Sequence, residues 1–81
     1  MTPTELSPRQ RDVLAAIDNI RRIAGFPPSI RELCLALGVS STNAVADHLK
    51  ALEKKGAIQR DRMKARSLRL TRRGRKQLNG G

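Results

Sequence analysis

A pair of short helices joined by a glycine-containing turn constrains the fold of this chain more than any other feature of its sequence. Within residues 30–37, apolar side chains recur at the spacing of one helix face, at Ile30, Leu33, Cys34 and Leu37. Gly38 follows as a helix stop, and a second helix is expected to begin at Ser40 or Ser41 and to run to about Lys55. Two helices joined in this way form a helix-turn-helix.

A longer helix is predicted before this pair, over about residues 8–24. Its apolar face consists of Val13, Leu14, Ile17, Ile20 and Ala24. Gly25 suits its C-terminal end, and the Phe-Pro-Pro connector at 26–28 prevents it from running on. Capping boxes are expected at the starts of the first two helices, at Ser7–Gln10 and at Ser29–Glu32.

The helix that follows the glycine-containing turn has two faces of opposite character. Its inward face is mostly apolar and consists of Ala44, Val45, His48, Leu49 and Leu52. Its other face is polar and consists of Ser41, Thr42, Asn43, Asp47 and Lys50. Small polar side chains in the first turns of a helix, with a lysine one turn further on, suit the floor of a DNA major groove. We therefore interpret this segment as a recognition helix.

Each of these residues also has a structural explanation, which the sequence leaves open. Ser41 could act only as a helix cap, and Asn43 only as a capping or solvated amide. Asp47 could act through the helix dipole or through an ion pair with Lys50. Ala44 could be present for core packing rather than to let the helix lie deep in a groove.

The hydrophobic period changes after Gly56. Ile58, Leu68 and Leu70 alternate with arginines, which predicts the two strands of a hairpin around a polar, basic tip at 61–66. Such a hairpin beside a helix-turn-helix is a wing. Thr71 is expected to cap a final short helix over residues 72–78.

These elements predict a mainly α fold with a small β-hairpin: a three-helix winged helix-turn-helix with a short C-terminal helix. We expect a flexible arm at residues 1–6, one domain at 7–78 and a frayed tail at 79–81.

The charge of the chain points to a polyanionic partner. The formal net charge is +10, and residues 57–81 hold nine lysines and arginines against one acid, Asp61. Phe26 is the only aromatic residue, which disfavours a single-strand binder that stacks bases on aromatic rings. Duplex DNA, which is bound through grooves and phosphates, needs no such platform.

Other functional classes find little support in the composition. Cys34 is the only cysteine and His48 the only histidine, so neither an internal disulfide nor a closed zinc site is expected. No apolar run is long enough to span a bilayer, and nothing resembles a signal peptide. We expect a cytoplasmic protein with no catalytic residues, no metal, no cofactor and no small-molecule substrate.

Several motifs follow one another in a specific order between residues 6 and 70. They are Leu6–Gln10, Val13–Leu14, Gly25–Ser29, Arg31–Glu32, Leu37–Gly38, Ser41, Asn43–Val45, His48–Leu49, Leu52, Lys55–Gly56, Ile58, Lys64, Arg66 and Leu68. This order resembles the amino-terminal DNA-binding domain of the LexA repressor family. The resemblance implies a winged helix-turn-helix repressor of the SOS response, which occupies a promoter operator.

Two features differ from the family pattern. The full repressor carries a carboxy-terminal self-cleaving serine–lysine domain that also dimerises it, and this chain stops before one, so we expect either a fragment or a stand-alone relative. Some members have two acids in the middle of the recognition helix, where this chain has Ala46–Asp47. The mode of docking is expected to be retained, whereas the operator sequence stays open. Residues 70–75 resemble the last strand and helix of other winged-helix regulators.

The expected partner is an operator in double-stranded DNA, a palindrome bound by two copies. These copies could form a homodimer by self-association or could cooperate only on DNA, so the oligomeric state stays open. Base readout is assigned to the recognition helix, at Ser41, Thr42, Asn43, Ala44, Asp47 and Lys50. Contacts to the backbone or the minor groove are assigned to Ser29, Arg31, Lys54, Arg62, Lys64 and Arg66. Arg60 and Arg69 are interpreted as outward strand positions. The basic residues at 72–76 could extend a phosphate track or bind another partner.

Two alternatives belong to other functional classes. A winged-helix adaptor such as an antirepressor would need an exposed apolar patch, for which Met63 and the ends of the first helix are the candidates. A nonspecific architectural binder of DNA or RNA would show no sequence preference in competition with unrelated duplex.

Overall fold

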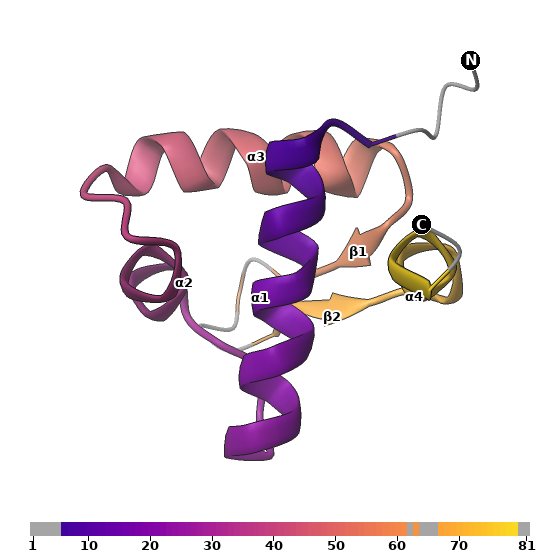
Figure 1. Cartoon of the computed structure of the whole chain (residues 1–81), viewed down its shortest axis with the longest axis horizontal. Coiled ribbons are helices and arrows are strands. Elements are labelled where there is room, and N and C mark those ends of the chain that lie inside the picture. The colour runs from indigo at the N-terminus through magenta and orange to yellow at the C-terminus, as the bar shows by residue number, and fades with distance from the viewer. Residues whose placement is uncertain (1–5, 62, 64–66, 80–81) are drawn as a thin grey trace.

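A computed structural model describes residues 6–61, 63 and 67–79 of the chain. Its elements are, in order, α1 (Pro8–Ala24), α2 (Ile30–Leu37), α3 (Thr42–Lys54), β1 (Ile58–Gln59), β2 (Arg69–Leu70) and α4 (Arg72–Asn79). In Figure 1, α1 passes in front of α3 and the hairpin, with α2 and α4 on either side of it. This arrangement confirms the predicted winged helix-turn-helix with a short C-terminal helix.

The first two helices begin at the capping boxes that the sequence predicts. The Ser7 Oγ accepts a hydrogen bond from the Gln10 N–H at 3.2 Å, and the Ser7 N–H donates to the Gln10 Oε1 at 3.1 Å. The reciprocal bonds between Ser29 and Glu32 measure 3.2 and 2.8 Å. Each box satisfies backbone donors that a helix start otherwise leaves without partners.

The helix-turn-helix bends at Gly38, whose φ of 69° lies in the left-handed region that favours glycine. Its N–H donates to the Leu35 carbonyl at 3.3 Å, and the Val39 N–H donates to the Cys34 carbonyl at 3.0 Å. These bonds satisfy the last carbonyls of α2. The chain then reaches the start of α3 after only a few residues, as the glycine-containing turn predicts.

The core lies where α1, α2, α3 and the hairpin meet. Its largest fully buried side chains are Leu14, Ile17, Leu33, Leu49, Leu52, Ile58, Val13, Val45 and Pro28. Cys34 is also buried, as a small core residue. Two details differ from the sequence-based expectation. Leu6, which the sequence analysis placed in the flexible arm, is 7% exposed and packs into the core. It lies next to the first helix cap, where burying its apolar side chain is favourable. Ala24, placed on the apolar face of the first helix, is exposed at the end of α1.

The hairpin is a short antiparallel pair in which Ile58 faces Leu70 and Gln59 faces Arg69. Ile58 and Leu70 are buried while Gln59 and Arg69 are exposed, so the predicted alternation is confirmed. This register places the base of the wing directly after the end of α3.

A compact set of contacts attaches α4 to the corner between α3 and β1. The Thr71 Oγ1 donates to the Gly56 carbonyl at 2.6 Å and accepts from the Gly74 N–H at 3.1 Å, which confirms Thr71 as the cap of this helix. The Thr71 N–H donates to the Ala57 carbonyl at 3.0 Å. Gly74 is buried, and a Cβ at that position would overlap the Ala57 carbonyl oxygen. The helix runs to Asn79, one residue further than predicted.

Candidate nucleic-acid interface

The helix α3, which the sequence predicts to be the recognition helix, has one buried face and one exposed face. Val45, Leu49 and Leu52 point into the core and are at most 1% exposed. The exposed positions of the segment are Ser41, Thr42, Asn43, Asp47, Lys50 and Lys54. Ala44 and His48 are half-buried at the boundary between the two faces. No described part of the chain therefore covers the polar face, and it is available to a partner.

Ser41 begins α3. Its Oγ accepts a hydrogen bond from the Ala44 N–H at 3.3 Å, so Ser41, rather than Ser40, is the cap. The Cys34 thiol donates to the Ser41 carbonyl at 3.9 Å, a weak contact that joins α2 to the start of α3. Ser41 is nevertheless exposed, and its hydroxyl proton can still be donated to a ligand.

Asp47 lies at an exposed position in the middle of the polar face. Within the described part of the chain, no ion pair joins it to Lys50, so the ion-pair explanation for Asp47 is not realised. Its carboxylate can accept a hydrogen bond from a donor such as a cytosine amino group. Lys50, three residues on, lies near it on the same face of the helix.

The start of α2 is a second place where donors reach the surface. The Ser29 Oγ already accepts the Glu32 N–H, which leaves its own proton for an external acceptor. Arg31 is exposed in the first turn of α2. The N-terminal end of a helix favours anions, and an arginine there adds a positive charge.

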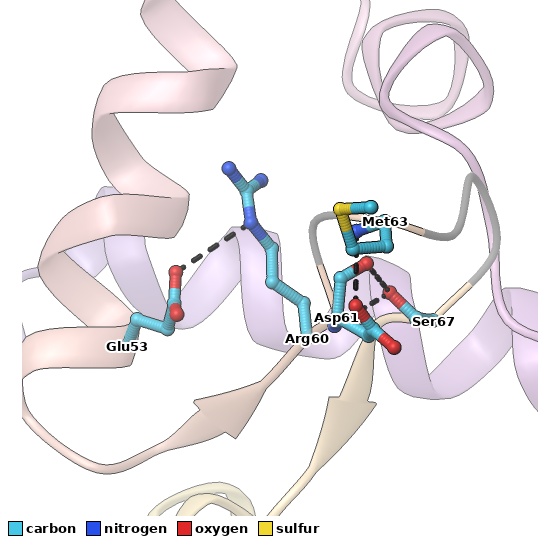
Figure 2. Close-up of polar contacts among 5 residues, drawn as sticks. All are labelled: Glu53, Arg60, Asp61, Met63 and Ser67. Atoms are coloured by element: carbon cyan, nitrogen blue, oxygen red, sulfur yellow. Dashed lines mark hydrogen bonds and ion pairs between the residues drawn. The ribbon is translucent and has the colours of Figure 1, made fainter.

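The base of the wing is closed by hydrogen bonds between its two sides (Figure 2). The Asp61 N–H donates to the Ser67 Oγ at 2.8 Å, and the Ser67 hydroxyl donates to the Asp61 carbonyl at 2.7 Å. The Met63 N–H donates to the Asp61 Oδ1 at 2.9 Å. The basic side chains assigned to the tip, Arg62, Lys64 and Arg66, lie outside the described residues.

Arg60 differs from its sequence-based interpretation as an outward strand position. Its side chain is only 15% exposed, and its Nε lies 3.5 Å from the Oε1 of Glu53 on α3. The same alternation that turns Ile58 inward and Gln59 outward returns residue 60 toward the molecule. Arg69, on the neighbouring strand, is exposed as expected. The sequence analysis assigned no role to Glu53. Its position seven residues before Arg60, across the turn at Gly56, was the only hint in the sequence that the two side chains could pair.

Arg73, in the basic C-terminal segment, adds to the contacts that attach α4. The Arg73 Nη1 donates to the Lys55 carbonyl at 3.4 Å and so contacts the C-terminal end of α3. Lys55 in turn donates from its Nζ to the Gln10 Oε1 of α1 at 2.8 Å. Arg72, Arg75 and Lys76 are exposed on α4. Lys55, the C-terminal cap of α3, is thereby connected to α1 and α4.

Large apolar side chains at the surface are scattered over different elements. They are Ile23, Phe26, Leu35 and Met63. Leu35, which is 78% exposed on α2, adds to the positions that the sequence suggested for an adaptor surface. Single exposed apolar residues are common on soluble domains and do not by themselves indicate an interface.

The described residues offer no cluster of three or more histidine, cysteine or acidic side chains that could hold a metal ion. Within the same residues, no helix has the length and apolar character needed to cross a membrane.

Comparison with known proteins points to a single family. The model of the family described as the LexA DNA binding domain matches residues 3–67. The chain is 48% identical over 71 residues to the LexA repressor of Myxococcus xanthus. The aligned region covers 88% of this chain and 32% of that protein. The chain is 49% identical over 76 residues to the LexA repressor of Anaeromyxobacter dehalogenans, with 94% and 33% covered. For the LexA repressor of Ligilactobacillus salivarius the identity is 44% over 68 residues, with 84% and 33% covered. The chain thus spans about a third of the length of these relatives.

Proposed function

Because the chain belongs to the LexA DNA-binding domain family, we propose that it binds double-stranded DNA selectively and represses transcription by occupying an operator. In this proposal α3 enters the major groove with its polar face toward the base edges. The wing lies along the adjacent backbone or minor groove, and the start of α2 contacts a phosphate.

The observation that carries the proposal is the exposure of the polar face of α3. Its three most N-terminal positions, Ser41, Thr42 and Asn43, are all exposed, although α3 packs tightly into the core on its other side. An uncovered polar stripe on a firmly held helix is what major-groove readout requires, because the rigid backbone fixes where each side chain can reach. Half-buried Ala44 keeps the profile of the helix low between these positions.

We assign roles to the exposed side chains from their hydrogen-bonding chemistry. The amide of Asn43 offers one donor group and one acceptor, which match the adenine edge. Asp47 can accept from cytosine, and Lys50 can reach guanine or a phosphate. Ser41 and Thr42 can bond to either a base or a phosphate.

Backbone contacts supply a second, sequence-independent contribution. Arg31 and Ser29 at the start of α2, together with Lys54 on α3, are the described candidates. The sequence adds Arg62, Lys64 and Arg66 at the tip of the wing, where a narrow minor groove would favour arginine. Because these contacts neutralise phosphates, binding is expected to weaken as salt is added.

A selection from random duplexes followed by sequencing tests the proposal. We expect one enriched consensus, with the selected duplex bound about 4–10 kcal/mol better than random DNA. Equal affinity for all duplexes would leave a nonspecific architectural binder, and no affinity for any duplex would favour an adaptor that binds protein.

Asn43→Ala then tests the assigned docking face. We expect it to reduce discrimination between the consensus and random duplex by about 1–3 kcal/mol, because a bidentate base contact is lost. Lys76→Ala on exposed α4 is a control that keeps the proposed readout face intact. If Asn43→Ala weakened binding to both duplexes equally, Asn43 would have no part in base readout.

A further inference from the structure

Glu53 and Arg60 connect the recognition helix to the wing. Glu53 lies in the last turn of α3, and Arg60 directly follows β1. The Arg60 Nε lies 3.5 Å from the Glu53 Oε1, and Figure 2 shows the arginine side chain extending from the strand toward the helix. This ion pair joins two different elements of the described structure, whereas the ion pair of Asp18 and Arg22 lies within α1, one turn apart.

Both side chains of the pair are partly sheltered from solvent. The side chains of Arg60 and Glu53 are 15% and 27% exposed, and the Arg60 Nε has no solvent contact and no hydrogen bond. Removing an arginine from water costs free energy, and the attraction to a nearby carboxylate offsets that cost. Ion pairs of this kind contribute little net stability, but they can select one arrangement of two elements over others. The geometry therefore points to positioning rather than to overall stabilisation.

A second set of contacts extends this fixed position into the loop. Asp61 follows Arg60, and both of its backbone polar groups bond to the Ser67 hydroxyl: the N–H donates to it and the carbonyl accepts from it. Its carboxylate also accepts from the Met63 N–H. The Glu53–Arg60 pair holds the first side of the wing against α3, and the Asp61–Ser67 contacts join the second side to the first. These contacts form a continuous path from α3 through Arg60 to the base of the loop.

We propose that Glu53 and Arg60 are positioning residues that set the orientation of the wing relative to α3. This inference rests on the proposed function, because orientation matters when both elements must fit one DNA duplex. Two contacts on one rigid body bind far better than the same contacts on a loose joint, since the second contact then loses little entropy on binding. Arg60 acts through the wing and Glu53 through Arg60; neither is assigned a contact with DNA.

Glu53→Gln tests the proposal, because a charge effect and a positioning effect would change DNA affinity in opposite directions. Removing a negative charge near a polyanion should tighten binding if charge alone mattered. Positioning predicts the opposite, a loss of about tenfold in affinity for the selected consensus duplex. Asp12→Asn, at an exposed site on α1, is the matched control and should leave affinity unchanged or slightly raised. Tighter binding by Glu53→Gln than by the control would overturn the proposal.

The exchanged pair Glu53→Arg with Arg60→Glu keeps the net charge and restores opposite charges at the two positions. We expect each single variant to lower the ratio of consensus to random affinity at least tenfold, and the exchanged pair to recover most of it. Arg69→Glu, which makes the same charge change at an exposed position on β2, should lower that ratio less than Arg60→Glu does. An exchanged pair as defective as Arg60→Glu, in a protein with an unchanged circular dichroism spectrum, would show that Arg60 acts by itself.

A measurement without DNA separates this inference from the proposed function. Nitrogen-15 relaxation of the Asp61, Met63 and Ser67 amides reports motion at the base of the wing. In Glu53→Gln we expect order parameters to fall at these amides, from about 0.85 toward about 0.6, while those of α1 stay constant. Unchanged order parameters would overturn the positioning role whatever the protein binds. Lowered order parameters in a protein that binds no DNA would refute the proposed function and retain the link between α3 and the wing.

Discussion

At the scale of single residues, Ser41 shows how one side chain can serve the fold and the candidate interface together. Its Oγ accepts the Ala44 N–H and begins α3, yet the residue stays exposed beside Thr42 and Asn43. The capping geometry uses a lone pair of the hydroxyl oxygen and leaves the proton available. A structural role for Ser41 is therefore compatible with a role in binding, and the two can be separated by substitution.

Ser41→Asp is expected to keep the helix and to impair DNA binding. Aspartate caps helices as well as serine does, and its charge is favourable at a helix N-terminus, so unfolding free energy should be unchanged or slightly raised. The same charge would repel phosphates and should lower duplex affinity about tenfold. Ser41→Ala should instead lower the unfolding free energy by about 1 kcal/mol. Urea denaturation and fluorescence anisotropy with labelled duplex measure the two effects, and an aspartate variant that binds normally would place Ser41 outside the interface.

At the scale of elements, local signals predicted the helices and nonlocal contacts escaped prediction. Ser7, Ser29 and Gly38 act within a few residues of the boundaries that they define, so helix ends could be placed from sequence. The exposed face of α3 also followed from local periodicity. Arg60 was misplaced because its partner Glu53 belongs to another element, and the tightness of the Gly74 packing depends on where the Ala57 carbonyl lies in space.

Gly74→Ala tests whether α4 is held as closely as this packing indicates. Alanine favours a helix over glycine by about 1 kcal/mol, which alone would stabilise α4. Its Cβ would overlap the Ala57 carbonyl oxygen, and overpacking against rigid backbone costs about 1–3 kcal/mol or more. We expect the overlap to prevail, so that the unfolding free energy falls. Lys76→Ala, at an exposed position of the same helix, is the control in urea denaturation. A more stable Gly74→Ala variant would mean that α4 does not rest on Ala57.

At the scale of the whole molecule, the distribution of charge and the position of the recognition helix support the same partner. Nine of the 17 lysines and arginines lie in residues 57–81 of the sequence, whereas α3 presents a mixed polar face. This separation suits a protein in which the basic segment attracts phosphates and the helix discriminates bases. Sequence composition could predict the attraction. Local periodicity also predicted which face of α3 is polar. The structure adds that α1, α2 and β1 pack on the opposite side of α3, so that the described residues leave the polar face uncovered.

The size of the proposed interface leads to an expectation for the number of copies on an operator. A single recognition helix can reach only a few bases, and each good bidentate contact contributes about 1–3 kcal/mol of discrimination, whereas specific operators are bound about 4–10 kcal/mol better than random DNA. We therefore expect two copies on a palindrome, with half-site centres about one helical turn, or a small multiple of it, apart.

Inserting about five base pairs between the half-sites turns them to opposite sides of the duplex and should abolish cooperative binding, while about ten should restore part of it. Gel-shift titration of the three duplexes, with sedimentation to count the bound copies, measures this. Saturation by a single copy, or an affinity indifferent to the spacing, would mean that one domain reads its site alone.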